Sequence, residues 1–429
     1  MRTVSKTVIG VDFGTQSARA VLVNAENGEI IYSCRKEYPY NSTPVPAIDC
    51  AENLPCATDY EMTLYELLRN VIPEEYRKTV AGICVDATSL TMVLLAEDGR
   101  ALSELDGWSE AAHARVKLWK YHRAQEKADE ALNLARNLQE PFLGRTGGSI
   151  SCEWMLPKLL EVRDEAPEIY SKIDLAMDLC EFLTFRLTGQ LVRSIGSLSY
   201  KCLWAEDLSF PERTFLNGLR AGFYEEYCHF LRGDVRKPGE CAGMLRSELT
   251  KRWGLPEQIP VATGMLDGHT SLATMGAFEP GDAALIVGTS NVCTVQDRKL
   301  QELKDVCGVA QDGMVTGSCG IDTGQSSTGN MLGWFVEHMA GWQIHREAEE
   351  RKISPHQVLA ERIQKPWENK VIAVDWWSGS RNAPCDLTLR GSMSGLEMDT
   401  KTEDIYLALL QAIACGTGTI LESLSGQGV

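Results

Sequence analysis

A carboxylate, a glycine and a hydroxyl lie close together near the start of the chain, in Asp12-Phe13-Gly14-Thr15. They follow one apolar run and precede another, a pattern that predicts two strands joined by a tight turn. A carboxylate at the end of a buried strand can hold a hydrated divalent cation, and a turn of this kind can bind phosphate oxygens through its amides and hydroxyl. An ordinary hairpin with Asp and Gly as turn residues explains the same pattern, so the motif needs support from elsewhere in the chain.

A second candidate carboxylate follows an apolar approach in Met265-Leu266-Asp267-Gly268-His269. An aspartate at a strand-to-helix junction is placed to act as a general base that takes a proton from a substrate hydroxyl. The alternative for Asp267 is a helix N-cap, which aspartate commonly supplies. His269 is a candidate substrate contact, with a packed or capping side chain as its alternative.

Two further turns of small residues occur in the second half of the chain. Gly288-Thr289-Ser290 lies between two apolar runs and repeats the plan of the opening hairpin. Two lobes facing each other with such turns would form a phosphate-lined cleft, although two unrelated hairpins fit the pattern equally well. In Asp322-Thr323-Gly324-Gln325, the aspartate can accept hydrogen bonds from sugar hydroxyls and Gly324 leaves room for a nucleotide phosphate. A connecting loop rich in Gly and Ser is the alternative there.

The elements that must position these residues are those of an α/β layer. Strands are expected at 29–38, 80–86 and 91–96, and a helix at 57–70. Ser89, in the polar turn after residues 80–86, is expected to face a ligand at the strand ends or to be a plain turn hydroxyl.

Two side chains of the first half have simpler alternatives than ligand binding. Trp119 falls in the helical pattern of 112–138, which equally fits an amphipathic surface helix with a tryptophan anchor. Lys201 falls in the hydroxyl-rich connection 194–204, where an exposed loop lysine is the alternative.

The length of 429 residues exceeds that of one ordinary core, which predicts two domains or lobes. The segment 239–256 reads as a link because Gly254 and Pro256 break a short helical pattern. We therefore expect lobes at 1–253 and 254–429.

Composition excludes some classes of partner. The chain carries 42 Lys and Arg against 59 Asp and Glu, a formal net charge of −17, which disfavours nucleic acid and anionic membranes. Its 14 cysteines are scattered singly, as in a reducing compartment. We see neither a secretory leader nor a segment approaching transmembrane length, and we expect a cytoplasmic protein.

Taken together, these segments resemble the FGGY carbohydrate kinases, and within that family they are most similar to the ribulokinases. The resemblance runs from the first strand to nearly the last residue and includes, besides the motifs above, Val116-Lys117-Leu118-Trp119-Lys120, Ser151-Cys152-Glu153-Trp154, Tyr200-Lys201-Cys202-Leu203-Trp204 and Val374-Asp375-Trp376-Trp377-Ser378-Gly379.

The resemblance implies an actin-like fold with two ribonuclease-H-like lobes, a sugar-binding lobe at 1–253 and a nucleotide-binding lobe at 254–429. It implies ATP and Mg²⁺, with Asp267 as the catalytic base and Asp12 near the metal. Sugar contacts are then expected from Ser89, Trp119, Lys201, Asp267, His269 and Asp322. Nucleotide contacts are expected from Gly14, Thr15, Gln16, Gly288, Thr289, Ser290, Gly324 and Gln325.

Two departures from the family pattern affect these expectations. Asp322 stands where ribulokinases usually carry a glutamate, so the sugar can differ in size or stereochemistry. The chain also ends before the later Gly-Gly segment that contacts the adenosine in this family, which implies an incomplete second lobe and weak ATP binding.

The expected function is phosphorylation of a ketopentose, with ribulose first. The alternatives are a kinase for another pentulose or a pentitol, and a sugar-binding protein of weak catalytic activity. A homodimer is a further expectation.

Overall fold

The computed structural model describes residues 6–38, 54–119, 121–364, 366–381, 386 and 388–429, so Lys120 of the quoted motifs lies outside the described residues. The chain divides into two compact units. Unit 1 comprises Met1–Leu143, Ser149–Thr274 and Ala310–Gly320, and unit 2 comprises Gly144–Gly148, Met275–Val309 and Ile321–Val429.

The main sheet of unit 1 has the strand order β3-β2-β1-β4-β10-β9, and β11 also pairs with β4. Strands β1, β2 and β3 form an antiparallel meander, whereas β4 runs parallel to β1, β10 and β11. Every second residue of β1 is buried, which is the pattern of a strand with one face in the core. The bounds are β1 Thr7–Phe13, β2 Ser17–Asn24, β3 Ile30–Glu37, β4 Val80–Ala87, β9 Cys241–Met244, β10 Pro260–Ala262 and β11 Met265–Leu266.

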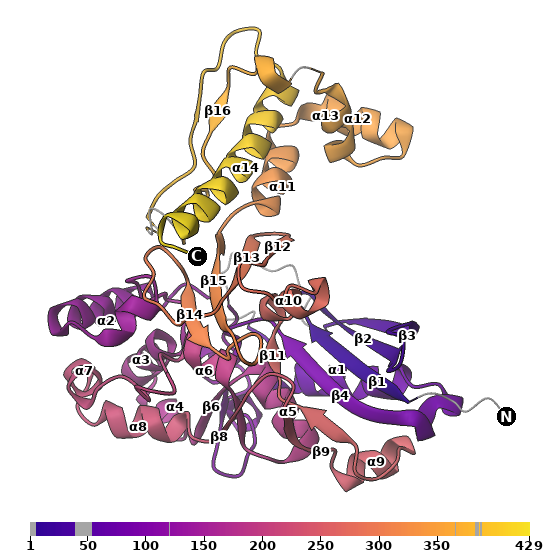
Figure 1. The fold of residues 1–429 in the computed structure, drawn as a ribbon, viewed down its shortest axis with the longest axis vertical. Coiled ribbons are helices and arrows are strands. Elements are labelled where there is room, and N and C mark those ends of the chain that lie inside the picture. The colour runs from indigo at the N-terminus through magenta and orange to yellow at the C-terminus, as the bar shows by residue number, and fades with distance from the viewer. Residues whose placement is uncertain (1–5, 39–53, 120, 365, 382–385, 387) are drawn as a thin grey trace. The chain divides into compact units, whose positions relative to one another are not determined.

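Two helices cover this sheet and close its apolar core. Helix α1 (Ala57–Asn70) contacts β2 and β3, and helix α5 (Leu179–Thr188) contacts β4 and β10 (Figure 1). Helix α5 is well delimited because Asp178 caps its first turn and Gly189, at φ +73°, ends it in the left-handed region.

A second apolar core of unit 1 forms around helix α3, which is buried along most of its length. The elements of this part, and the connecting helix α9, are β5 Met92–Leu95, β6 Leu175–Asp178, β7 Val192–Ser194, β8 Asp234–Arg236, α2 Gln125–Leu138, α3 Met155–Glu165, α4 Pro167–Tyr170, α6 Ile195–Lys201, α7 Arg213–Leu219, α8 Phe223–Phe230 and α9 Ser247–Trp253. Short 3-10 helices are η3 Glu74–Thr79, η4 Leu102–Glu104, η5 Ala112–Ala114 and η6 Pro141–Arg145.

A four-stranded sheet with the order β12-β13-β15-β14 and the helices α11 to α14 make up most of the remaining structure. Helix α14 contacts α11, α13 and β16 (Figure 1). The bounds are η7 Asp267–His269, α10 Thr270–Met275, β12 Ala283–Val287, β13 Asn291–Asp297, β14 Gly308–Gln311, β15 Cys319–Gln325, α11 Gly329–His338, α12 Gly341–Arg351, α13 Pro355–Arg362, η8 Pro366–Glu368, β16 Ile372–Ala373, β17 Met393–Ser394 and α14 Thr402–Gly426.

Helix α14 corrects the expectation that no segment approaches transmembrane length. Among the described residues it is the one helix that is long and apolar enough to cross a membrane, judged by length and composition alone. The core helix of a globular unit passes the same test. Tyr406 and Leu409 of α14 belong to the apolar core of unit 2, and 28% of its apolar 18-residue window is buried.

The predicted helix over 112–138 is only partly correct. A short 3-10 turn is present at its start, and the α-helix begins at Gln125. The backbone between them is not helical, because Lys117 exchanges two backbone hydrogen bonds with Met92. Trp119 therefore lies on an irregular segment rather than on a surface helix.

The predicted link at 239–256 is folded into unit 1. It forms β9 and α9, and Gly254 and Pro256 end α9 shortly before β10, a strand of the main sheet. The longest stretch of unit 1 ends at Thr274, beyond the boundary expected near residue 253, and Ala310–Gly320 also belongs to unit 1.

Candidate active site

Three aspartates gather at the carboxyl ends of neighbouring parallel strands of unit 1. Asp12 in β1 is in register with Asp86 in β4, and Asp86 is in register with Met265 of β11, two residues before Asp267. Because parallel strands bring their carboxyl ends to one edge of a sheet, residues far apart in the sequence meet there. The sequence pattern singles out Asp12 and Asp267 but not Asp86.

Asp86 and Asp267 of this cluster differ in pKa. Burial, more than the nearby Asp12, raises the pKa of Asp267 to about 6. Burial, followed by the charge and hydrogen bond of Asp12, raises the pKa of Asp86 to about 8. Asp86 therefore keeps its proton to higher pH than Asp267 does. Such divergent pKa values in adjacent groups are typical of sites that move protons.

Hydrogen bonds hold the carboxylate of Asp267 in place. The backbone N–H of Gly268 donates to its Oδ1 at 2.7 Å, and the N–H of Ser89, in the turn after β4, also donates to it. Asp267 is the first residue of the 3-10 helix η7, whose N-cap position is Leu266, and η7 has no side-chain capping hydrogen bond. A Cβ atom at Gly264 would lie 2.5 Å from the carbonyl oxygen of Cys180, which explains why glycine precedes β11.

Trp119 and Ser89 lie at the same edge of unit 1. The indole Nε1 of Trp119 donates to Thr15 Oγ1 at 3.1 Å, which joins the irregular segment to the β1–β2 turn. Ser89 Oγ is buried and has no hydrogen-bond partner among the described residues. A buried hydroxyl in that state suits a ligand hydroxyl. Gly14 accepts from the Tyr38 hydroxyl through its carbonyl, and Gln16 is exposed.

The other two predicted sugar contacts of unit 1 are buried near Asp267. Lys201 lies in α6, not in an exposed loop, and is 6% exposed. Its positive charge lowers the pKa of Asp267, which opposes the effect of burial. His269 packs edge-on against Tyr200, with ring centroids 4.5 Å apart. The structure thus brings Ser89, Lys201 and His269 toward Asp267.

Activity is expected to fall as the pH is lowered through the pKa of Asp267. The ionised carboxylate is the form that accepts a proton, so kcat should decline about tenfold per pH unit below about pH 6, where the protonated form dominates. Above pH 7, titration of Asp267 should contribute no further rise. A kcat profile between pH 4.5 and 8 measures this, and a flat profile down to pH 5 would contradict the assignment.

In unit 2, the turn Gly288-Thr289-Ser290 packs against the start of α11. The carbonyl oxygens of Gly288 and Thr289 accept from the backbone N–H groups of Gly329 and Asn330, at 3.0 and 3.2 Å. The turn remains exposed at Gly288 and Thr289. This exposure suits the phosphate contact predicted from the sequence, which stays a prediction.

Gln325 has an internal role in unit 2. It accepts hydrogen bonds from Asn291 Nδ2 at 2.9 Å and Thr417 Oγ1 at 2.7 Å, and it donates to Asp375 Oδ2 and to the carbonyl of Ile413. These contacts join β13, β15 and α14. The structure therefore gives Gln325 a packing role, and its nucleotide contact stays a prediction.

The β15 residues Asp322 and Gly324 lie in the same unit. Asp322 is 7% exposed, and its contact with sugar stays a prediction. A Cβ atom at Gly324 would lie 2.1 Å from the carbonyl oxygen of Asn291 in β13. Close packing within the sheet therefore explains this glycine without reference to a phosphate.

The described residues contain no group of three or more His, Cys, Asp or Glu side chains arranged to hold a metal ion. Asp12 is an exposed carboxylate at the end of β1. A magnesium ion that arrives on nucleotide phosphates needs only one or two protein carboxylates and keeps several waters, so Asp12 fits that kind of contact.

Comparison with known protein families identifies the family of this chain. The model of the N-terminal domain of the FGGY family of carbohydrate kinases matches residues 7–274, and that of the C-terminal domain matches residues 283–429. The chain belongs to the FGGY family of carbohydrate kinases. It is accordingly an ATP-dependent sugar kinase by family, as the resemblance of its motifs predicted.

The matches to curated relatives extend over nearly the whole of this chain. It is 34% identical over 435 residues to a ribulokinase of Halalkalibacterium halodurans, covering 99% of this chain and 77% of the relative. It is 36% identical over 440 residues to a ribulokinase of Mycolicibacterium smegmatis, covering 99% and 77%. The chain thus spans about three quarters of the length of these relatives.

Solved structures confirm the predicted fold class. Xylulose kinase from Rhodospirillum rubrum matches with a TM-score of 0.74 at 20% identity, covering 99% of this chain and 80% of that chain. Plasmodium falciparum glycerol kinase with ADP matches with a TM-score of 0.76 at 16% identity, covering 98% and 79%. The fold is that of the FGGY sugar kinases.

Proposed function

We propose that this FGGY kinase transfers the γ-phosphoryl group of ATP to a hydroxyl of a ketopentose, with ribulose as the first candidate. The observation that carries the proposal is the Asp267 carboxylate, held by two backbone N–H groups at the carboxyl edge of the main sheet with a pKa raised to about 6. The substrate class is supported by the two relatives above that are named ribulokinases.

Asp267 acts as the general base in this proposal. Its carboxylate removes the proton of the sugar hydroxyl, the hydroxyl oxygen forms a bond to the γ-phosphorus, and the bond to the β,γ-bridging oxygen breaks to release ADP. Phosphoryl transfer demands mainly positioning and charge neutralisation from the protein. A base with a pKa near 6 is ionised at neutral pH yet basic enough to assist.

The remaining predicted residues bind and orient in this proposal. Sugar contacts are assigned to Ser89, Trp119, Lys201, His269 and Asp322. Asp12 holds the hydrated Mg²⁺ that accompanies ATP, and that ion neutralises phosphate charge when bound. Nucleotide contacts are assigned to Gly14, Thr15, Gln16, Gly288, Thr289, Ser290, Gly324 and Gln325.

Asp322 is the residue that tests the choice of sugar. Its side chain is one methylene shorter than the glutamate usual in ribulokinases, so the pocket can favour another pentulose or a pentitol. We also propose that the enzyme acts in the cytoplasm and that it forms a homodimer. Sedimentation of the purified protein would test the homodimer.

A coupled ADP-release assay with Mg²⁺ and ATP, run over both enantiomers of ribulose and xylulose and over ribitol and arabinitol, tests the function. We expect sugar-dependent ADP release that is fastest with one ribulose enantiomer. Fastest turnover of a different pentulose or of a pentitol would move the substrate assignment within the family. Thermal stabilisation by sugar without ADP release would contradict the kinase proposal and indicate a sugar-binding protein.

A further inference from the structure

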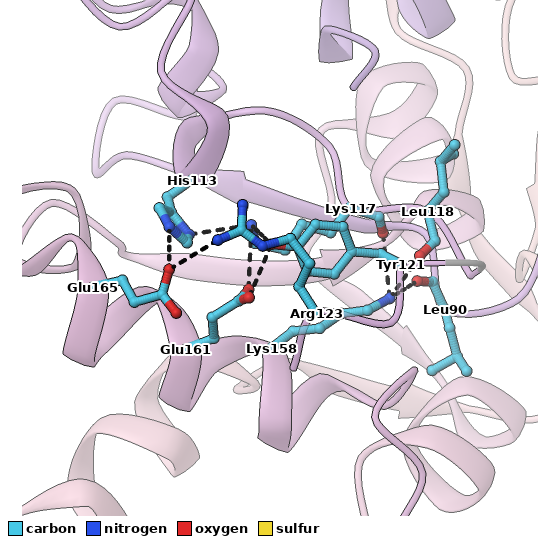
Figure 2. Close-up of polar contacts among 9 residues, drawn as sticks. All are labelled: Leu90, His113, Lys117, Leu118, Tyr121, Arg123, Lys158, Glu161 and Glu165. Carbon is cyan, nitrogen blue, oxygen red and sulfur yellow. Dashed lines mark hydrogen bonds and ion pairs between the residues drawn. The ribbon is translucent and has the colours of Figure 1, made fainter. Parts of the chain in front are cut away.

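The interior of unit 1 contains two fully buried lysines that belong to none of the sets of site residues above. Lys117 and Lys158 each have an exposed fraction of 0%. Burial lowers the pKa of Lys117 to about 8 and that of Lys158 to about 7. Placing an ammonium group in an apolar core is costly unless it gains strong partners. The partners of the two lysines differ, as Figure 2 shows.

Lys117 lies beside one carboxylate and two further polar side chains. Its Nζ is 3.6 Å from Glu161 Oε2, 3.2 Å from His113 Nδ1 and 3.4 Å from the hydroxyl of Tyr121. The Tyr121 hydroxyl donates to Glu161 Oε1 at 2.9 Å. All of these contacts join one side chain to another.

Lys158, one turn of α3 before Glu161, binds backbone instead. Within the described residues it makes no ion pair, and its Nζ donates to the carbonyl oxygens of Leu90 at 2.7 Å, Leu118 at 2.9 Å and Lys117 at 3.4 Å (Figure 2). Leu90 follows Ser89 directly, and Leu118 precedes Trp119. One ammonium therefore ties together the two segments that carry these predicted sugar contacts.

The turn at Leu90 needs such a tie. Leu90 has φ +62°, a left-handed conformation that a leucine adopts only when its surroundings impose it. Both of its peptide groups are held from the core: its N–H donates to Asp178 Oδ2 at 3.0 Å, and its carbonyl accepts from Lys158. The same turn presents the N–H of Ser89 to the Asp267 carboxylate.

We propose that Lys158 is a positioning residue of the phosphoryl transfer. By binding the carbonyl oxygens of Leu90 and Leu118, it keeps the N–H of Ser89 hydrogen-bonded to the Asp267 carboxylate and keeps Trp119 in contact with the sugar. This inference rests on the proposed function, because it assumes that Asp267 and these two residues serve the sugar. Lys158 itself touches neither substrate in this proposal.

The test replaces Lys158 with methionine, which keeps the length of the side chain and removes the donor. We expect kcat/KM for the sugar to fall by about 10²-fold while the KM for ATP stays within about twofold, since a small displacement of positioned groups is costly at the reacting centre. Hydrogen exchange of the amides in residues 86–95 should also become faster.

Lys117→Met is the matched control. It removes an equally buried lysine and leaves Glu161 without its cation, so it should destabilise unit 1 at least as much. If lost activity followed only from lost stability, this variant would show the same change in sugar kcat/KM, and the proposal would be overturned. We expect its sugar kinetics to remain near those of the unmodified enzyme.

Two further outcomes keep this inference separate from the proposed function. An unmodified enzyme without sugar-dependent ADP release would defeat the proposed function, whatever the variants do. An active enzyme whose Lys158→Met variant has unchanged sugar kinetics would defeat only the role of Lys158. If the methionine variant does not fold, Lys158→Gln, which retains two N–H donors on a shorter chain, should fold and show a smaller loss in the same direction; unchanged sugar kinetics in that variant would overturn the proposal.

Discussion

Replacing Asp267 with asparagine should lower kcat by about 10²- to 10⁴-fold, the range that a positioned general base contributes. The amide keeps the shape of the side chain and an oxygen that can accept from Gly268 and Ser89, so the fold and the binding of sugar should persist. Steady-state ADP release gives kcat, and titration calorimetry of the variant gives the affinity for sugar.

The exposed Asp106 provides the control, because Asp106→Asn makes the same chemical change outside the carboxylate cluster. Its kcat should equal that of the unmodified enzyme. If Asp267→Asn also retained kcat, the assignment of the base would be wrong. A joint loss of sugar affinity and kcat would show instead that Asp267 serves binding.

Replacing Arg193 with methionine should produce the largest loss of stability. Arg193 is fully buried and lies 2.8 Å from Glu181, and it also donates to the carbonyl oxygens of Ala176, Phe230 and Arg232. Removing one partner of a buried ion pair leaves a charge uncompensated and typically costs about 3–5 kcal/mol. Urea denaturation followed by fluorescence measures the change in the free energy of unfolding.

An exposed pair nearby serves as the comparison. Arg236 lies 2.7 Å from Asp234 on β8, and the exposed fractions of the two side chains are 44% and 71%. Surface pairs contribute about 0–1 kcal/mol, so Arg236→Met should change the free energy of unfolding by no more than that. Equal losses in both variants would mean that burial does not distinguish the two pairs.

The parts of the site that follow from local patterns could be predicted from the sequence. The hairpin around Asp12 and the strand before Asp86 have clear alternation and buried runs, and both form where expected. Asp267 could be singled out because it follows an apolar approach at a junction. The 3.6-residue period also predicted α1 correctly.

Asp86 was missed because its role depends on sheet register. Only the parallel pairing of β1 with β4 brings it beside Asp12, and no local pattern encodes that pairing. The polar turn that follows a buried strand was the available signal. Lys158 was missed for a related reason: a lysine flanked by apolar residues gives no local sign of the distant backbone carbonyls to which it donates.

The predicted bounds of helices and loops were wrong where tertiary contacts overrode local propensity. Residues before Gln125 have helical composition, yet the pairing of Lys117 with Met92 and the contacts of Trp119 with Thr15 hold that segment in an irregular path. Lys201 looked like a loop residue because hydroxyls surround it in the sequence, whereas it ends the buried helix α6. Composition alone carries no information about the path of this segment or about the burial of Lys201.

The most direct test of the central claim is ³¹P nuclear magnetic resonance of the reaction of this protein with ATP, Mg²⁺ and ribulose. We predict a new phosphomonoester resonance of the sugar that grows in step with ADP, and that grows at least about 10²-fold more slowly when Asp267→Asn replaces the unmodified enzyme. Formation of ADP and inorganic phosphate without a sugar phosphate would contradict the account.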